Sequence, residues 1–166
     1  QSNAANTGIA LIKEDFDNLN FNPADNFCYL LSEPVLGAGN TYGDSITSSI
    51  GNKIRSDEEI IFLNISIPGS TIYEWIKWYG EDVNQSLKVI LDKNSLKTVI
   101  WIQGESENLV TSKKYFDNFK ILKEIIFKDL SKEFDDTQFL ITRSTICANR
   151  NDQTKVNEVM ERERKK

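Results

Sequence analysis

The stretch that decides the fold is Thr98–Glu107, which reads TVIWIQGESE. Its first half, Thr98–Ile102, is a compact run of apolar and β-branched residues, typical of a buried strand. Its second half turns polar at once, with Gln103, Gly104 and Glu105 following the last apolar residue. A glycine allows the tight or left-handed backbone that such a turn needs. The stretch therefore predicts an amide and a carboxylate at the carboxyl edge of a sheet.

Outward from this strand, short apolar runs alternate with segments of helical periodicity. Two further runs have the composition of buried strands, Glu59–Ser66 and Gln138–Thr142. Apolar residues at spacings of three and four predict helices between and beyond them, at Ser45–Arg55, Ile72–Tyr79, Asp82–Leu91, Lys113–Phe134 and Asp152–Lys165. Residues 1–45 are rich in turn-forming residues and predict mostly loop, apart from an apolar patch at Phe27–Leu31.

Strands that alternate with helices predict an α/β fold with a parallel sheet. Functional sites in such sheets lie at the carboxyl ends of the strands. That rule selects three loops as the place to look for chemistry, namely Ile67–Thr71, Gln103–Leu109 and Arg143–Asn149.

Composition narrows the classes of function. The net charge of −5 argues against a nucleic acid partner, because a phosphate backbone attracts a basic face. No run of about 18 apolar residues is present, so we expect no membrane span. The two cysteines, Cys28 and Cys147, could pair, although two separate thiols are favoured and two cysteines are no disulfide framework. Without histidine they are too few for a zinc or iron–sulfur site. We expect no metal and no cofactor.

Four segments, in order, resemble blocks of one enzyme superfamily. WIQGESE resembles the W-x-Q-G-E-S-D signature of sialate O-acetylesterase-like and acetyl-xylan esterase-like members of the SGNH hydrolases. The opening Gln1-Ser2-Asn3-Ala4 resembles their nucleophile block, and Pro68–Ile72 followed by Trp75 resembles their G-G-T-S-I…W block. Cys28-Tyr29, followed by Glu33–Gly37, resembles a Cys-Tyr…Asp-Pro-Leu-Leu-Gly block of bacterial members. The resemblance implies a three-layer α/β/α fold with a parallel, flavodoxin-like sheet.

The same resemblance implies a serine hydrolase that removes acetyl groups from sugars or other small esters. Ser2 takes the position of the nucleophile, which attacks the ester carbonyl and forms an acyl-enzyme. The oxyanion is then held by the backbone N–H groups of Ser2 and Gly69 and by the side-chain amide of Gln103. Glu105 matches a carboxylate that orients the catalytic histidine in some members.

Three departures from the family pattern accompany these matches. The C-terminal Asp-x-x-His block is absent, and the 166 residues contain no histidine at all. The strand that should precede the nucleophile is also missing before Gln1. We therefore expect residues 1–166 to be a single, incomplete domain of this kind, truncated at both ends. Finally, Pro68 replaces a glycine, and proline has no N–H to donate to an oxyanion.

Alternative interpretations of the same residues stay open. Gln1–Ala4 also matches a scar left by tag cleavage. Gly43–Thr47 is similar to a GDSL motif, which would make Ser45 the nucleophile of a lipase or esterase, although a helix start is favoured there. The missing histidine is also compatible with a non-catalytic carbohydrate-binding remnant. Trp75 lies on the apolar face of its helix and is expected in the core, whereas Trp78 points elsewhere and is a candidate for stacking on a sugar.

Overall fold

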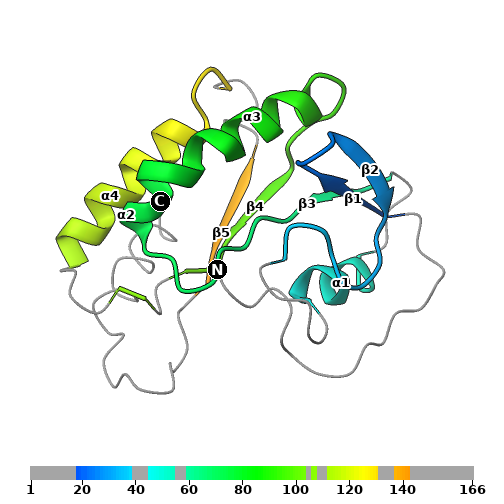
Figure 1. The fold of residues 1–166 in the computed structure, drawn as a ribbon, viewed down its shortest axis with the longest axis horizontal. Helices are drawn as coiled ribbons and strands as arrows, with labels where there is room; N and C mark the ends of the chain where they lie inside the picture. The colour runs from blue at the N-terminus through cyan, green and yellow to red at the C-terminus, as the bar shows by residue number, and fades with distance from the viewer. Residues whose placement is uncertain are drawn as a thin grey trace. The chain divides into compact units, whose positions relative to one another are not determined.

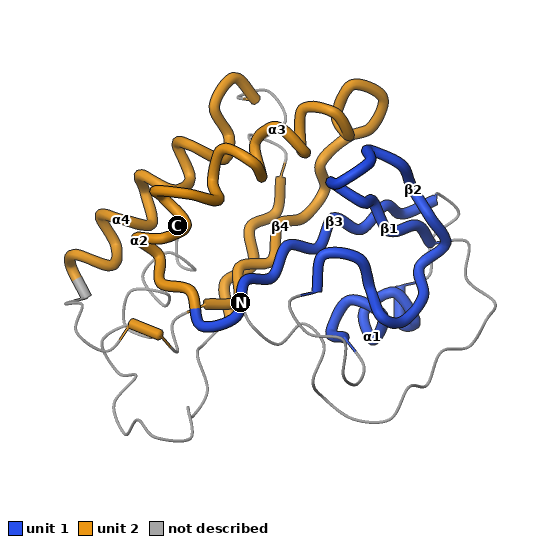
Figure 2. The backbone as a smooth tube through the Cα atoms, in the orientation of Figure 1, with its two compact units in different colours: residues 1–69 blue, residues 70–166 orange. Residues whose placement is uncertain are grey.

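The structure is a computed structural model, and it describes residues 18–38, 45–54, 59–103, 106–107, 112–130 and 137–142. Figure 1 shows the helices and strands in this part of the chain. Two compact units are present, residues 1–69 and residues 70–166, coloured separately in Figure 2. Each unit is considered by itself below.

The first unit contains a three-stranded sheet of order β2-β1-β3. Its strands are β1 (Leu19–Asn22), β2 (Phe27–Leu30) and β3 (Ile61–Leu63). Strand β1 pairs in parallel with β3, with Leu19 opposite Ile61. It pairs antiparallel with β2, because the turn between them is far too short for the crossover that parallel strands require. The sheet is therefore mixed: the pair β1–β3 is parallel, in line with the predicted parallel sheet, whereas the antiparallel pair β1–β2 was not predicted.

Strand β1 was expected as loop, and its polar alternation explains why. The sequence Leu-Asn-Phe-Asn places Asn20 at a buried position, where it is only 1% exposed. Its side chain is hydrogen-bonded to the backbone of two other segments. Oδ1 accepts from the N–H of Leu36 at 2.6 Å, and Nδ2 donates to the carbonyl of Phe62 at 3.1 Å. A buried asparagine with these bonds joins two segments, but its type alone indicates a turn.

Helix α1 (Ile46–Gly51) begins where the sequence predicted a helix. Ser45 is its N-cap, and the Ser45 side chain accepts a hydrogen bond from the backbone N–H of Ser48 at 3.0 Å. The helix is shorter than the expected Ser45–Arg55.

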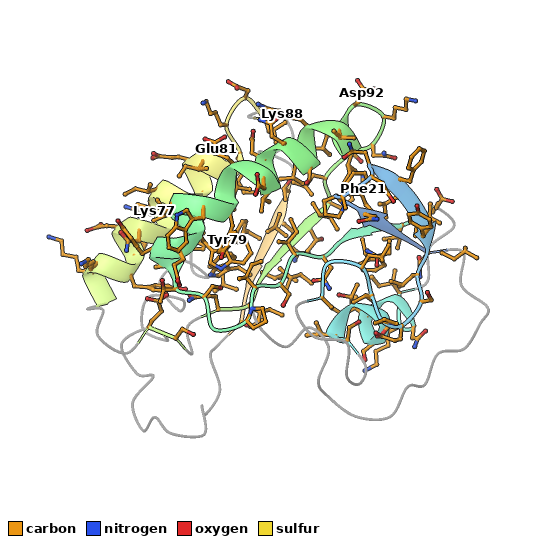
Figure 3. All side chains as sticks on the ribbon, viewed as in Figure 1. Phe21, Lys77, Tyr79, Glu81, Lys88 and Asp92 are labelled. Carbon is orange, nitrogen blue, oxygen red and sulfur yellow. The ribbon has the colours of Figure 1, made fainter. Side chains whose placement is uncertain are left out.

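In the second unit, one continuous helical stretch replaces the two expected helices at Ile72–Tyr79 and Asp82–Leu91. It consists of α2 (Ile72–Glu74), a π-helical segment η1 (Trp75–Tyr79) and α3 (Gly80–Leu91). Trp75 packs in the core at 3% exposure, as its spacing predicted. Figure 3 labels Glu81 in the first turn of α3, Lys88 in its last turn and Asp92 at its C-cap.

Strands β4 (Thr98–Trp101) and β5 (Gln138–Ile141) form a parallel pair in this unit, with Thr98 opposite Gln138. Helix α4 (Ser112–Ile126) packs beside α3 and against the strands through aromatic side chains. The Phe119 ring lies 5.9 Å from that of Trp101 and 5.8 Å from that of Phe139. The predicted strands and the α/β class are confirmed here. The three-layer, flavodoxin-like arrangement and the single domain stay predictions, and the expected helix Asp152–Lys165 lies outside the described residues.

Candidate active site

The predicted site residues divide into those that the structure describes and those that it does not. Ser2 and Glu105 lie outside the described residues, so their roles stay predictions. Gly69 ends the first unit and Gln103 belongs to the second. Cys28 is an exposed free thiol, whereas Cys147 lies outside the described residues.

The best-defined member of the site is Gln103. It follows β4 directly, as the sequence predicted, and its side chain is only 1% exposed. Nε2 donates to the carboxylate of Glu107 at 2.6 Å and to the backbone carbonyl of Ser70 at 3.3 Å. Oε1 accepts from the hydroxyl of Tyr115 at 2.6 Å. The amide is thus held on three sides, and its orientation is fixed.

Tyr115 was missed by the sequence interpretation, which placed Phe116 on the buried face of its helix. In the structure Tyr115 is 1% exposed, and its hydroxyl also accepts from the indole N–H of Trp101 at 3.2 Å. The signal was present in the sequence, because Tyr115, Phe119 and Leu122 are spaced by four and three residues.

Glu107 is the second residue that sequence reasoning missed. Its side chain is 4% exposed, and Oε1 accepts both from Gln103 Nε2 and from the backbone N–H of Ile72. The other oxygen, Oε2, is buried and has no hydrogen-bond partner among the described residues. Burial raises the pKa of this carboxyl group above its ordinary value, although the two hydrogen bonds oppose the shift.

The helix start that Glu107 contacts is independently capped. Thr71 is the N-cap of α2, and a capping box joins its side chain and backbone to Glu74. The Glu74 carboxylate accepts from the Thr71 N–H at 2.7 Å and from the Thr71 hydroxyl at 2.8 Å. Ser70, just before the cap, accepts from the indole N–H of Trp75 at 2.7 Å. The segment Ser70–Trp75 is therefore a rigid support for the loop after β4.

The predicted oxyanion donor Gly69 lies in the turn Pro68-Gly69, with φ at +69°. This left-handed conformation favours glycine. Apart from Gly69 and its two chain neighbours, no atom of the described residues lies within 4 Å of where a Cβ would stand. A side chain here would meet no steric barrier from those residues, only backbone strain.

The geometry does not favour Ser45 as a nucleophile. Its side chain is fully buried, and Oγ is engaged in capping α1. A nucleophilic hydroxyl must reach a substrate carbonyl and have a base beside it. Instead, the Ser45 N–H donates at 2.7 Å to Glu33, which also accepts from the Ser48 hydroxyl. Ser45 is a helix cap, as the sequence favoured.

A family model matches residues 18–166, and its description is "Carbohydrate esterase, sialic acid-specific acetylesterase". The chain belongs to this family. The match includes the loop after β4 with Gln103 and Glu107, whereas Ser2 precedes it. We found no match among curated proteins and none among solved structures.

Membership of the carbohydrate esterase family confirms the resemblance on which the site was predicted, and it makes this chain part of a group of acetylesterases. The family description indicates small acetylated substrates. In the part of the chain that the structure describes, no helix has the length and apolar character to cross a membrane.

Buried Glu107 gives the stability of this member of the carbohydrate esterase family a testable pH dependence. Since the folded-state pKa is raised, the unfolded chain loses the Glu107 proton first as the pH rises. The contribution of Glu107 to the free energy of unfolding is therefore largest below its unfolded-state pKa, near 4.5, and falls as the pH rises to the folded-state pKa. Glu107→Gln carries no ionisable group, so its stability relative to the wild type should increase across that window. Urea unfolding of both proteins from pH 4 to 8 measures this, and a constant difference would contradict it.

Proposed function

We propose that this chain is the nucleophile- and oxyanion-bearing part of a carbohydrate O-acetylesterase that works through an acyl-enzyme. One observation carries the proposal. The family match coincides with a loop after β4 that holds a buried, oriented amide, that of Gln103. A preorganised donor at the carboxyl end of a parallel strand is the arrangement that stabilises charge developing in a transition state.

In the proposed reaction, the hydroxyl oxygen of Ser2 attacks the acetyl carbonyl carbon while its proton passes to an imidazole base. No histidine occurs among the 166 residues, so a residue outside them must supply this base. The carbonyl oxygen becomes the oxyanion. The bond from the acetyl carbon to the sugar oxygen then breaks, and the sugar hydroxyl leaves with the proton. Water repeats the sequence on the acyl-enzyme and releases acetate.

The oxyanion donors in this proposal are the N–H groups of Ser2 and Gly69 and the Gln103 amide. Both amide hydrogens of Gln103 are engaged in the structure, one on Glu107 and one on Ser70. The bond to Ser70 is the longer, at 3.3 Å, and is the weaker of the two. In the proposed mechanism, the Gln103 N–H that bonds to the Ser70 carbonyl gives up this bond and donates to the oxyanion. Glu105 orients the imidazole.

The second candidate is a carbohydrate-binding protein without catalysis. The absence of histidine favours it, and so does the full engagement of the Gln103 amide. Trp78, which is 52% exposed beside Lys77, would then contribute an aromatic face to sugar binding.

The deciding experiment measures acetate release from acetylated sialic acid, acetylated xylan oligosaccharides and p-nitrophenyl acetate. It compares the 166 residues with a form extended to the natural ends of the gene. We expect release by the extended form only. Release by neither, combined with calorimetric binding of the same sugars, favours the binding protein. Release by the 166 residues alone would contradict the mechanism, because no imidazole is present.

A further inference from the structure

Hydrogen bonds to both N–H groups and to the carbonyl oxygen fix the orientation of the Gln103 amide. A glutamine amide has two N–H donors and one carbonyl acceptor. Here both donors and the acceptor have partners, namely Glu107, the Ser70 carbonyl and the Tyr115 hydroxyl. The shortest donor contact is to Glu107, so this carboxylate is the strongest constraint on the Gln103 N–H groups.

Glu107 is itself held in place by the start of a helix. Its Oε1 accepts from the backbone N–H of Ile72, the first residue of α2. That N–H belongs to the groups that a helix leaves unpaired at its start, and a carboxylate is favoured there. One oxygen atom thus joins the Gln103 amide to the helix start. Because Glu107 is only 4% exposed, water does not replace this connection.

A terminal amide has two orientations of similar intrinsic energy, related by a half-turn. In the flipped orientation, the Gln103 carbonyl oxygen would face the Glu107 oxygen, which now lies 2.6 Å from the amide nitrogen. Two acceptors at that distance repel each other. The flip would also turn the N–H groups toward the Tyr115 hydroxyl, which now donates. Glu107 and Tyr115 therefore select the same orientation.

We propose that Glu107 is a positioning residue, which binds one N–H of the Gln103 amide and so directs the other N–H, the one now on the Ser70 carbonyl, for donation to the oxyanion. This inference rests on the proposed function and adds a residue to its site. Without Glu107, the amide rotates and presents its carbonyl oxygen to the developing negative charge for part of the time. The ester substrate binds as before, and the chemical step slows.

The kinetic test uses four variants of the protein extended to its natural ends. In Glu107→Ala, kcat should fall by about 10- to 100-fold while KM stays within about threefold, because the loss concerns the transition state. Glu107→Gln keeps an acceptor for Ile72 and Gln103, so its kcat should stay within about threefold of the wild type. Tyr115→Phe removes the donor to Gln103 Oε1 and leaves the helix start intact, and it should also lower kcat.

Glu74→Ala is the matched control. The variant removes a carboxylate from the same helix start, where Glu74 accepts hydrogen bonds from Thr71 and not from Gln103. Its kcat should stay within about threefold of the wild type. If Glu74→Ala lowers kcat as much as Glu107→Ala does, or if neither lowers it, the positioning role is overturned. Should Glu107→Ala fail to fold, the other two variants still test the role. It is overturned if Tyr115→Phe leaves kcat unchanged or if Glu107→Gln lowers kcat by more than about threefold.

A second readout does not depend on esterase activity. The side-chain amide protons of Gln103, assigned by their absence in Gln103→Glu, should give two resolved NMR signals that exchange slowly with water. Glu107→Ala should merge their shifts toward free glutamine and speed their exchange, and Glu107→Gln should preserve them. Unchanged signals in Glu107→Ala overturn the inference. Changed signals in a protein that releases no acetate overturn the proposed function and leave the positioning of Gln103 standing.

Discussion

Ser2→Ala should abolish acetate release by the full-length protein, with kcat falling on the order of 10⁴- to 10⁶-fold. The reason is chemical. Alanine has no hydroxyl oxygen to form the acyl-enzyme, and only the oxyanion donors and substrate binding remain. Acetate release under single-turnover conditions, together with mass spectrometry of the trapped acyl-enzyme, checks the expectation. An acyl group found on Ser2 identifies the nucleophile directly.

Ser45→Ala is the matched control for this prediction. Ser45 is fully buried and caps α1, so its loss should leave kcat within about threefold of the wild type. The free energy of unfolding should fall by about 1 kcal/mol, the usual effect of losing an N-cap side chain. If activity disappears in Ser45→Ala and survives in Ser2→Ala, the assignment of the nucleophile is wrong and the GDSL interpretation is right.

Hydrophobic periodicity was enough to predict the described strands of the second unit and most of its described helical residues. TVIW at β4 and QFLI at β5 are short apolar runs, and both are strands in a parallel pair. The helices before β4 and between β4 and β5 were predicted from spacings of three and four residues, because each buries one face. The π-helical segment Trp75–Tyr79 was not predicted. Its extra residue per turn joins two patterns that look separate under a period of 3.6.

Polar residues in buried positions account for most of what the sequence did not predict. Asn20 made β1 look like a loop, although its side chain bonds to the backbone of Leu36 and Phe62. Glu107 looked like part of a polar turn. Its proposed role depends on the hydrogen bond that it accepts from the N–H of Ile72, which is 35 positions away in the chain. A motif predicted Gln103, but only the folded chain shows which partners orient its amide.

Gly37→Ala should cause a large loss of stability. Gly37 has a φ of +81°, in the left-handed region that disfavours any residue with a Cβ. A Cβ built there would lie 1.7 Å from the carbonyl oxygen of Asn64, an impossible contact with backbone. The Gly37 carbonyl also accepts from the N–H of Ser66 at 2.9 Å, which fixes the two segments side by side. Neither segment can move away without breaking this bond.

The expected loss is about 2–5 kcal/mol, the sum of left-handed strain and overpacking. Gly69→Ala separates these two contributions. Its φ of +69° is similar, but apart from residue 69 and its two chain neighbours, no atom of the described residues lies within 4 Å of the added Cβ. It should therefore lose only about 1–2 kcal/mol, the conformational part. Urea unfolding of both variants measures the difference. Equal losses would show that the steric contact at Asn64 is relieved by movement of the chain, whereas a greater loss in Gly37→Ala locates a rigid backbone contact between residue 37 and the segment after β3.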